Sequence, residues 1–198
     1  MNFWDQQFSS DTFKYGTAPN AFVTEQAVRL DPCSCVLVPG DGEGRNSVWL
    51  AEQGHRVLAV DASSVGLSKA RKLAAQRQVT IETEHTDLTH WVPSRPYDAL
   101  VLTYVHLPAE CRQAIHRNLA QALRPGGILI LEAFNPGQLS RTSGGPKNPE
   151  LLYPLDLIRH DFNRLLHETY GTECEISLDE GPGHQGLACV TRYIGTRT

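Results

Sequence analysis

Three glycines and two acidic residues stand together in the segment PGDGEGRN, which runs from Pro39 to Asn46. Gly40, Gly42 and Gly44 follow a short apolar run and precede an amphipathic stretch. Glycines at such a strand-to-helix turn let the backbone bend sharply and let a ligand lie against it. The helix that follows adds free N–H groups and partial positive charge. The segment therefore predicts a ligand-binding loop, and the alternative is a role in turn formation and packing alone.

A carboxylate at the end of the next apolar run completes this pattern. Asp61 lies seventeen residues after Gly44, where it can accept from two ribose hydroxyls of a nucleoside. The glycine spacing is G-x-G-x-G, whereas dinucleotide-binding proteins use G-x-G-x-x-G. The earlier third glycine favours a ligand without phosphates, such as S-adenosylmethionine.

The elements that must position these residues alternate along the chain between short apolar runs and amphipathic stretches. We expect strands at Cys35–Val38, Arg56–Val60, Val79–Glu82, Ala99–Tyr104 and Ile128–Phe134. We expect helices at Arg45–Gln53, Ser64–Gln76 and Pro108–Leu123. This alternation predicts an α/β, doubly wound, parallel sheet.

The pattern changes after Phe134. Residues 135–153 are rich in Gly, Pro and Ser, and a loop of this length is usually functional or disordered. The apolar spacing predicts a helix over Pro154–Leu166. Two late strands, Glu173–Leu178 and Ala188–Gly195, are joined by the turn DEGPGHQG and predict an antiparallel edge.

Composition limits the classes that remain. The chain has 198 residues, 40% of them hydrophobic and 20% charged, which excludes a disordered class and predicts one domain over residues 1–198. Its net charge of −4 and lack of a basic patch argue against a nucleic-acid partner. The sequence has no membrane-length apolar run and no signal-like start, so we expect a cytoplasmic protein. The spacing of the five cysteines and of the histidines indicates no metal site.

Motifs along the whole chain resemble the class I S-adenosylmethionine-dependent methyltransferases. The matching segments are VLVPGDGEGRN, LAVDASSVGLSKA, TDLTHW, YDALVLTYVHLP and LRPGGILILEAF. The opening FWDQQF…YGTAPNAFV and the set HLP…GGPK…DEG..HQG are similar to the tellurite-resistance and thiol-methyltransferase-like branch. The resemblance implies a Rossmann-like, mostly parallel seven-stranded sheet with an antiparallel last strand. It also implies an N-terminal lid segment at residues 1–30 and a substrate-side loop at 135–153.

The resemblance assigns residues to the cofactor. Those implied to bind S-adenosylmethionine are Tyr15, Gly40, Asp41, Gly42, Gly44, Arg45, Asp61, Ala62, Asp87, Leu88 and Thr103. Asp87 would accept from the adenine amino group, with Leu88 packed nearby, and Tyr15 would lie over the cofactor. The sequence departs from the family at Val38, where an acidic residue is usual. We expect Asp41, Glu43 or a water molecule to take over its role.

Four further residues are candidates for the methyl acceptor. His106 follows the fourth strand, whose end faces the methyl group in this class, and His184 lies in the late turn. Each is interpreted as a base or substrate-binding residue, and the alternative is a structural hydrogen bond to a nearby carbonyl or turn. Arg141 and Lys147 would attract an anionic substrate, or are solvated loop charges.

The sequence thus predicts a methyltransferase that acts on a small molecule, with a thiol or a metalloid oxyanion as candidate acceptors. Almost every residue belongs to the cofactor fold, which leaves no separate domain for a large substrate. The Asn/Asp-Pro-Pro-aromatic signature of methyltransferases that act on amino groups of DNA or glutamine is absent. The alternatives are a cofactor-binding regulatory protein without catalysis and a nicotinamide-dependent oxidoreductase. The oligomeric state is open.

Overall fold

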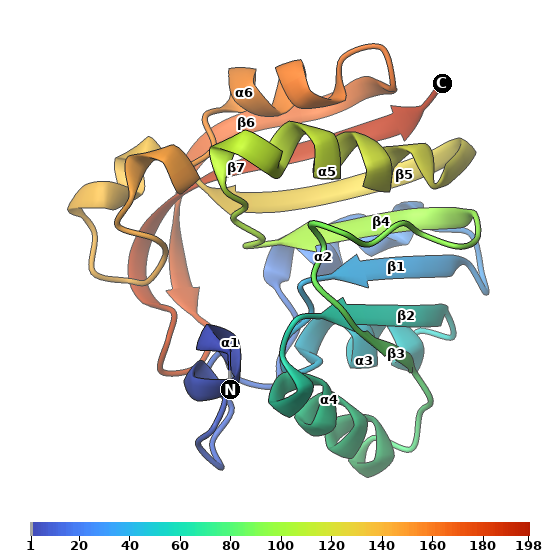
Figure 1. Cartoon of the computed structure of the whole chain (residues 1–198), viewed down its shortest axis with the longest axis vertical. Helices are drawn as coiled ribbons and strands as arrows, with labels where there is room; N and C mark the ends of the chain where they lie inside the picture. Colours follow the sequence, from blue (N-terminus) through green and yellow to red (C-terminus); the bar gives the residue numbers. More distant parts are fainter. Residues whose placement is uncertain (1) are drawn as a thin grey trace.

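A twisted sheet of seven strands runs through the molecule, with helices on both faces (Figure 1). The structure is a computed structural model that describes residues 2–198. The strands are β1 (Cys35–Pro39), β2 (Arg56–Asp61), β3 (Glu82–His85), β4 (Tyr97–Thr103), β5 (Leu123–Phe134), β6 (Leu166–Asp179) and β7 (Gln185–Arg197). The helices are α1 (Phe3–Gln7), α2 (Ala21–Gln26), α3 (Arg45–Glu52), α4 (Ser64–Gln76), α5 (Ala109–Gln121) and α6 (Leu155–Phe162). Short 3₁₀ turns lie at Ala27–Arg29, Pro136–Ser140 and Pro149–Leu151.

The strand order is β3-β2-β1-β4-β5-β7-β6. The first five strands pair in parallel, whereas β7 is antiparallel to both β5 and β6. This arrangement confirms the predicted mostly parallel, seven-stranded sheet with an antiparallel last strand. It also brings the carboxyl ends of β1, β2 and β4 to one edge, where ligands bind in open α/β sheets.

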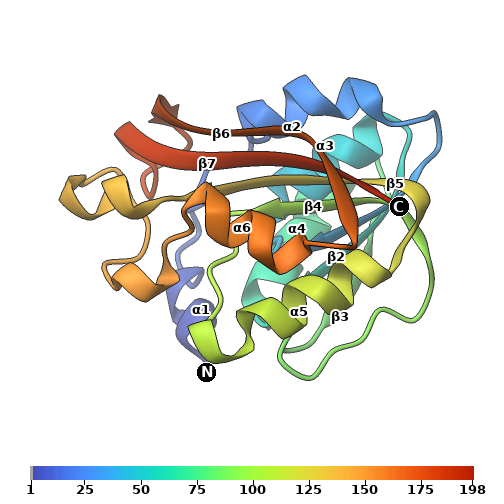
Figure 2. The same cartoon turned by 90° about the horizontal axis from the view of Figure 1, so that it is seen from above.

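Each face of the sheet is buried beneath its own set of helices (Figure 2). On one face, Phe22 and Val23 of α2 and Leu50 of α3 pack on apolar residues of β1, β2, β4 and β5. On the other face, Ile115 of α5 and Phe162 of α6 lie in a second apolar cluster. Burial on both faces explains why these strands read as continuous apolar runs rather than alternating ones.

The third strand was predicted three residues too early. Its apolar residues Val79 and Ile81 pack against α3 and α4 instead of pairing in the sheet. The Val79 N–H also donates to the Ala74 carbonyl at 3.0 Å and so closes the end of α4. The polar run Glu82–His85 then forms the edge strand beside β2.

Other boundaries also differ from the prediction. β5 begins at Leu123, because this residue already pairs with Tyr97 of β4. The late strands pair along thirteen positions and are much longer than expected. The predicted lid segment begins at residue 1, which lies outside the described residues. No helix within residues 2–198 has the length and hydropathy to span a membrane.

Candidate functional site

The loop between β1 and α3 is shaped by three glycines in the left-handed region. Gly40, Gly42 and Gly44 have φ angles of 65°, 63° and 93°. A Cβ on Gly44 would lie 2.6 Å from the Cβ of Ala70, so Gly44 permits close contact between α3 and α4. A Cβ on Gly42 would lie 3.0 Å from the ring of Phe8 in the N-terminal segment. Gly44 therefore has the packing role, whereas Gly42 faces the segment that covers the loop.

Asp61 ends β2 directly beside this loop. Its Oδ2 accepts from the N–H of Gly42 at 2.8 Å, and its Oδ1 accepts from the N–H of Ser63 at 2.7 Å. Burial raises the pKa of Asp61, and these two N–H groups act in the opposite direction. Each carboxylate oxygen has further lone-pair capacity, so Asp61 can also accept from a pair of ligand hydroxyls.

The two acidic residues of the loop already have partners. Asp41 accepts from the N–H of Ser47 at 3.2 Å and from its hydroxyl, and burial raises the pKa of Asp41 to about 7. Glu43 forms an ion pair with Lys69 and accepts from the N–H of Lys14 at 2.7 Å. Glu43 therefore fastens the loop to the N-terminal segment. Asp41 is left as the better candidate to replace the missing acidic residue of the family.

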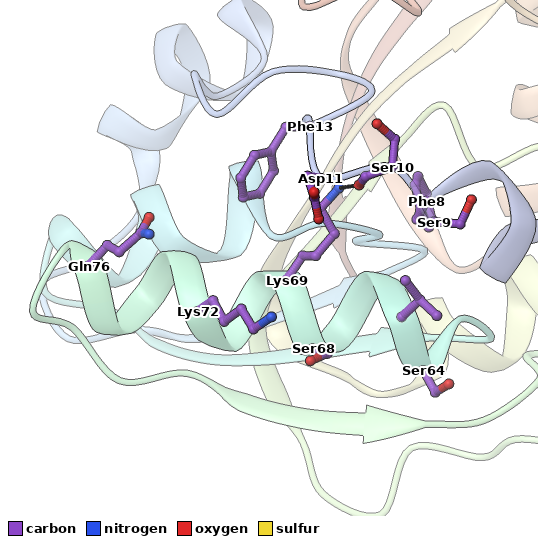
Figure 3. Close-up of a pocket in the computed structure, with 11 residues that line it drawn as sticks. Phe8, Ser9, Ser10, Asp11, Phe13, Ser64, Ser68, Lys69, Lys72 and Gln76 are labelled. Atoms are coloured by element: carbon purple, nitrogen blue, oxygen red, sulfur yellow. Dashed lines mark hydrogen bonds between the residues drawn. The ribbon is translucent and has the colours of Figure 1, made fainter.

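Residues 2–16, which we call the N-terminal strap, cross the region between this loop and α4. Figure 3 shows Lys69 reaching from α4 toward the strap, where its Nζ donates to the carbonyls of Ser10 at 2.8 Å and Thr12 at 2.7 Å. Lys69 is 9% exposed, so these bonds are largely shielded from water. The ammonium thus joins the strap to the glycine loop through Glu43.

The first turn of the strap is held at the start of α4. The Asp5 carboxylate accepts from the Ser63 hydroxyl at 2.8 Å and from the N–H of Val65 at 3.3 Å, while the Asn2 amide donates to the Ala62 carbonyl. A groove of about 420 Å³ lies between this turn and the ends of β2 and β3. The groove is lined by Asn2, Phe3, Trp4, Ala62, His85, Thr86 and Asp87. It includes Ala62 and Asp87, two of the predicted cofactor-binding residues.

Known proteins resemble this chain in sequence as well as in structure. The family described as Methyltransferase domain matches residues 36–127. Glycine N-methyltransferase of Rattus norvegicus is 30% identical over 149 residues, which are 67% of this chain and 51% of that protein. Cypemycin N-terminal methyltransferase of a Streptomyces species is 33% identical over 125 residues, 61% of this chain and 49% of that protein. The chain spans about half the length of these curated relatives.

Two solved structures share the fold. TehB of Haemophilus influenzae superposes with a TM-score of 0.75 at 17% identity, covering 99% of this chain and 66% of that one. The N-methyltransferase NodS of Bradyrhizobium japonicum, in complex with S-adenosylhomocysteine, superposes with a TM-score of 0.72 at 16% identity. The match covers 98% of this chain and 96% of that one. Residues 36–127 belong to the methyltransferase domain family, and the whole chain has the fold of the class I S-adenosylmethionine-dependent methyltransferases. This confirms the family that the sequence motifs indicated.

The end of β4 carries an unusual hydroxyl group. The Oγ1 of Thr103 is buried and has no hydrogen-bond partner within residues 2–198. A buried polar atom of this kind is rare and is expected to have a partner when a ligand is bound. Thr103 was among the predicted cofactor-binding residues.

His184 lies in the β6–β7 turn against three aromatic rings. Its ring centroid is 4.3 Å from that of Tyr15, 4.7 Å from Tyr104 and 5.3 Å from Phe134. Its Nδ1 is 3.1 Å from Oε2 of Glu180, and no hydrogen bond to its Nε2 is found in the part of the chain that the structure describes. Burial lowers the pKa of His184, although Glu180 acts in the opposite direction. The imidazole is therefore oriented and neutral at physiological pH, with one nitrogen still able to accept.

The predicted substrate-side loop lies next to this imidazole. A Cβ on Gly144 would lie 2.6 Å from Cδ2 of His184 and 3.3 Å from its Nε2, so only glycine fits beside that edge of the imidazole. A Cβ on Gly145 would lie 2.7 Å from the Phe134 ring. The strap reaches the same place, because the N–H of Gly183 donates to the Lys14 carbonyl at 2.8 Å (Figure 1).

His106 has no such free nitrogen. Its Nδ1 is 2.5 Å from the Leu151 carbonyl, and its Nε2 is 3.4 Å from the N–H of Phe134. Burial lowers the pKa of His106 to about 4, which keeps the ring neutral. Its place after β4 agrees with the sequence analysis, but its contacts are those of the structural alternative. We interpret it as a residue that joins the end of β4 to the substrate-side loop and β5.

The side chains of Arg141 and Lys147 both contact other groups of the protein. Arg141 forms an ion pair with Glu175 of β6, and the Nζ of Lys147 donates to the Arg141 carbonyl. Both contacts fix the substrate-side loop. They give no support for a role of these two residues in attracting an anion.

The sequence analysis missed a buried polar network around the acceptor side. Glu132 of β5 is 1% exposed and accepts from the Asn20 amide at 2.6 Å, the Tyr104 hydroxyl at 2.7 Å and the Arg192 guanidinium at 2.6 Å. Tyr104 has a φ of 55°, a strained value for a residue with a side chain. The one signal in the sequence was a lone Glu in the apolar run ILILEAF, because a charge in a buried strand requires partners.

Proposed function

We propose that residues 1–198 act as one methyltransferase domain that transfers a methyl group from S-adenosylmethionine to a small molecule. The observation that carries this proposal is the carboxylate of Asp61 beside the glycine loop, at the edge where β1, β2 and β4 end. The adjoining groove, lined by Ala62 and Asp87, has the apolar walls and polar rim that an adenosine group needs.

The residues on this side fit the cofactor. Asp61 would bind both ribose hydroxyls, Asp87 the adenine amino group, and Leu88 would pack nearby. Thr103 would find its missing hydrogen-bond partner in the cofactor. When bound, the cofactor supplies a methyl group on a positively charged sulfur. The protein contributes mainly by holding the acceptor in line with that methyl group, and such positioning alone accounts for several kcal/mol of a barrier.

On the acceptor side we assign the proton-accepting role to His184. The acceptor would pass a proton to Nε2 while its nucleophile forms the bond to the methyl carbon and the carbon–sulfur bond breaks. A neutral imidazole serves an acceptor that must lose a proton, such as a thiol or an amine, and gives little to a metalloid oxyanion. Two relatives, a glycine N-methyltransferase and an N-terminal methyltransferase, are named for amine acceptors.

Placement in the cytoplasm stays a prediction from composition.

Two measurements test this function. Calorimetry with S-adenosylmethionine should give binding, and calorimetry with NAD should give none. Release of S-adenosylhomocysteine should then be followed with panels of small thiols, small amines and metalloid oxyanions. Binding of NAD alone would favour an oxidoreductase. Cofactor binding without turnover on any panel would favour a regulatory protein.

A further inference from the structure

Glu180 connects the cofactor side of the site with the imidazole of His184. Its Oε2 is 3.0 Å from Nη1 of Arg45 and 3.1 Å from Nδ1 of His184, and its Oε1 accepts from the Asn20 amide at 3.1 Å. The Glu180 side chain is 12% exposed and that of Arg45 is 8% exposed. One ion-pair partner and two hydrogen-bond partners, from three segments of the chain, therefore fix one carboxylate.

Arg45 and Asn20 come from elements that are far from Glu180 in the sequence. Arg45 is the first residue of α3 and directly follows the glycine loop. Asn20 is the N-cap of α2, and its N–H also donates to the Asn46 side chain at 2.9 Å. Glu180 itself lies at the start of the β6–β7 turn, four residues before His184. The loop that faces the cofactor is thus tied through Arg45 to the turn that carries the imidazole.

The contact with Glu180 decides which nitrogen of His184 carries the proton. A carboxylate is only an acceptor when ionised, so Nδ1 must be the donor and Nε2 the free lone pair. Burial raises the pKa of Glu180, but the hydrogen bond from His184 and the charge of Arg45 outweigh it, and the pKa is lowered overall. Glu180 is therefore ionised at neutral pH.

Other charged and titratable groups also face His184. Arg45 and Glu132 act on it through space, the rings of Tyr15 and Tyr104 pack against it, and His106 lies within electrostatic reach. Among residues 2–198, Glu180 is the one carboxylate in hydrogen-bond contact with its ring.

Resting on the proposed function, we propose that Glu180 is a positioning residue for methyl transfer. It holds His184 in the tautomer with the proton on Nδ1, and Arg45 anchors it to the cofactor loop. The acceptor then meets a lone pair on Nε2, and the positive charge that forms on the ring faces a carboxylate. This favours acceptors whose nucleophile is protonated at neutral pH, such as amines and thiols.

The test uses imidazole ¹⁵N NMR of the full chain saturated with S-adenosylhomocysteine, with His184 assigned through its loss in His184→Gln. In the wild type, Nδ1 should carry the proton. In Glu180→Gln the pKa of His184 should fall by about one unit, because a buried anionic partner favours the charged ring. The matched control is Glu175→Gln on the same hairpin, where Glu175 is 47% exposed and pairs with Arg141. This control should change neither the tautomer nor the pKa of His184.

The outcomes separate the two proposals. A wild-type His184 with its proton on Nε2 overturns the role of Glu180 without any variant, and so does an unchanged tautomer and pKa in Glu180→Gln. A wild-type protein that does not bind S-adenosylhomocysteine overturns the proposed function, whereas the tautomer can still be measured. A merely structural Glu180 would lower the melting temperature in Glu180→Gln and leave the pKa of His184 in place.

Discussion

Replacing Asp61 by asparagine is the sharpest test of the cofactor site. The carboxylate accepts from Gly42 and Ser63 at 2.8 and 2.7 Å, so asparagine must turn its NH₂ group toward one of these N–H groups. An unsatisfied buried N–H costs about 1–3 kcal/mol of unfolding free energy. A lost hydrogen bond to a charged group costs a similar amount, so affinity for S-adenosylhomocysteine should fall roughly ten- to a hundredfold.

A loss of affinity alone would not separate ribose binding from a distorted glycine loop. We therefore compare S-adenosylhomocysteine with its 2′-deoxyribose analogue by calorimetry in both proteins. In the wild type, removing the 2′-hydroxyl should weaken binding about tenfold or more. In Asp61→Asn the same change should cost less than about threefold, because the partner of that hydroxyl is already impaired.

The matched control is Asp98→Asn at the opposite end of the sheet. Asp98 also accepts from a backbone N–H, that of Cys35 at 2.7 Å, and pairs with Arg124. This variant should lose stability and keep its affinity for S-adenosylhomocysteine. Equal penalties for the 2′-deoxy analogue in wild type and Asp61→Asn would refute the ribose assignment, whatever the absolute affinities.

Three further predictions follow from the site. Gly42→Val should abolish S-adenosylhomocysteine binding in calorimetry, because its Cβ would lie 3.0 Å from Phe8 and its φ of 63° disfavours a branched residue; retained binding would show that the strap can yield. Burial raises the pKa of Asp41 from 3.8 to about 7, so the folded protein favours the protonated carboxyl group. The contribution of this group to the free energy of unfolding is fully present below pH 3.8 and is lost as the pH rises through about 7. The melting temperature of Asp41→Asn should therefore fall less between about pH 5 and pH 8 than that of the wild type, and an equal fall would contradict the buried position of Asp41. His184→Ala should lower turnover with little effect on affinity for S-adenosylhomocysteine, whereas His106→Ala should mainly lower the melting temperature; the reverse pattern in paired assays would exchange their roles.

The sequence predicted the sheet well, and it placed Asp61 beside the glycine loop, because both depend on local patterns. Apolar runs, the glycine spacing and an acidic residue at the end of the second strand are each visible within a few residues. Val79 and Ile81 misled the prediction of β3, since an apolar pair reads the same whether it enters a sheet or packs on helices. Nothing in the local pattern separates these two outcomes.

The acceptor side was harder to predict because its contacts join distant segments. Glu180 and His184 are four residues apart, but they meet through a turn rather than a helix, so periodicity gave no indication of the pair. Arg45 was assigned to the cofactor from its place after the glycines, and its ion pair with Glu180 spans most of the chain. His106 and His184 looked equivalent in the sequence, and only the backbone groups around His106 distinguish them.

The bonding of the N-terminal strap has a consequence for the rate at which a bound molecule leaves. Asp5 belongs to the strap and also accepts from Val65 in the first turn of α4, so lifting the strap costs the helix a stabilising contact. A molecule bound beneath the strap would leave only after this local unfolding, so its residence time would be set by that opening. Weakening Lys69, which holds the middle of the strap, should shorten the residence time while the contacts to the molecule itself stay intact.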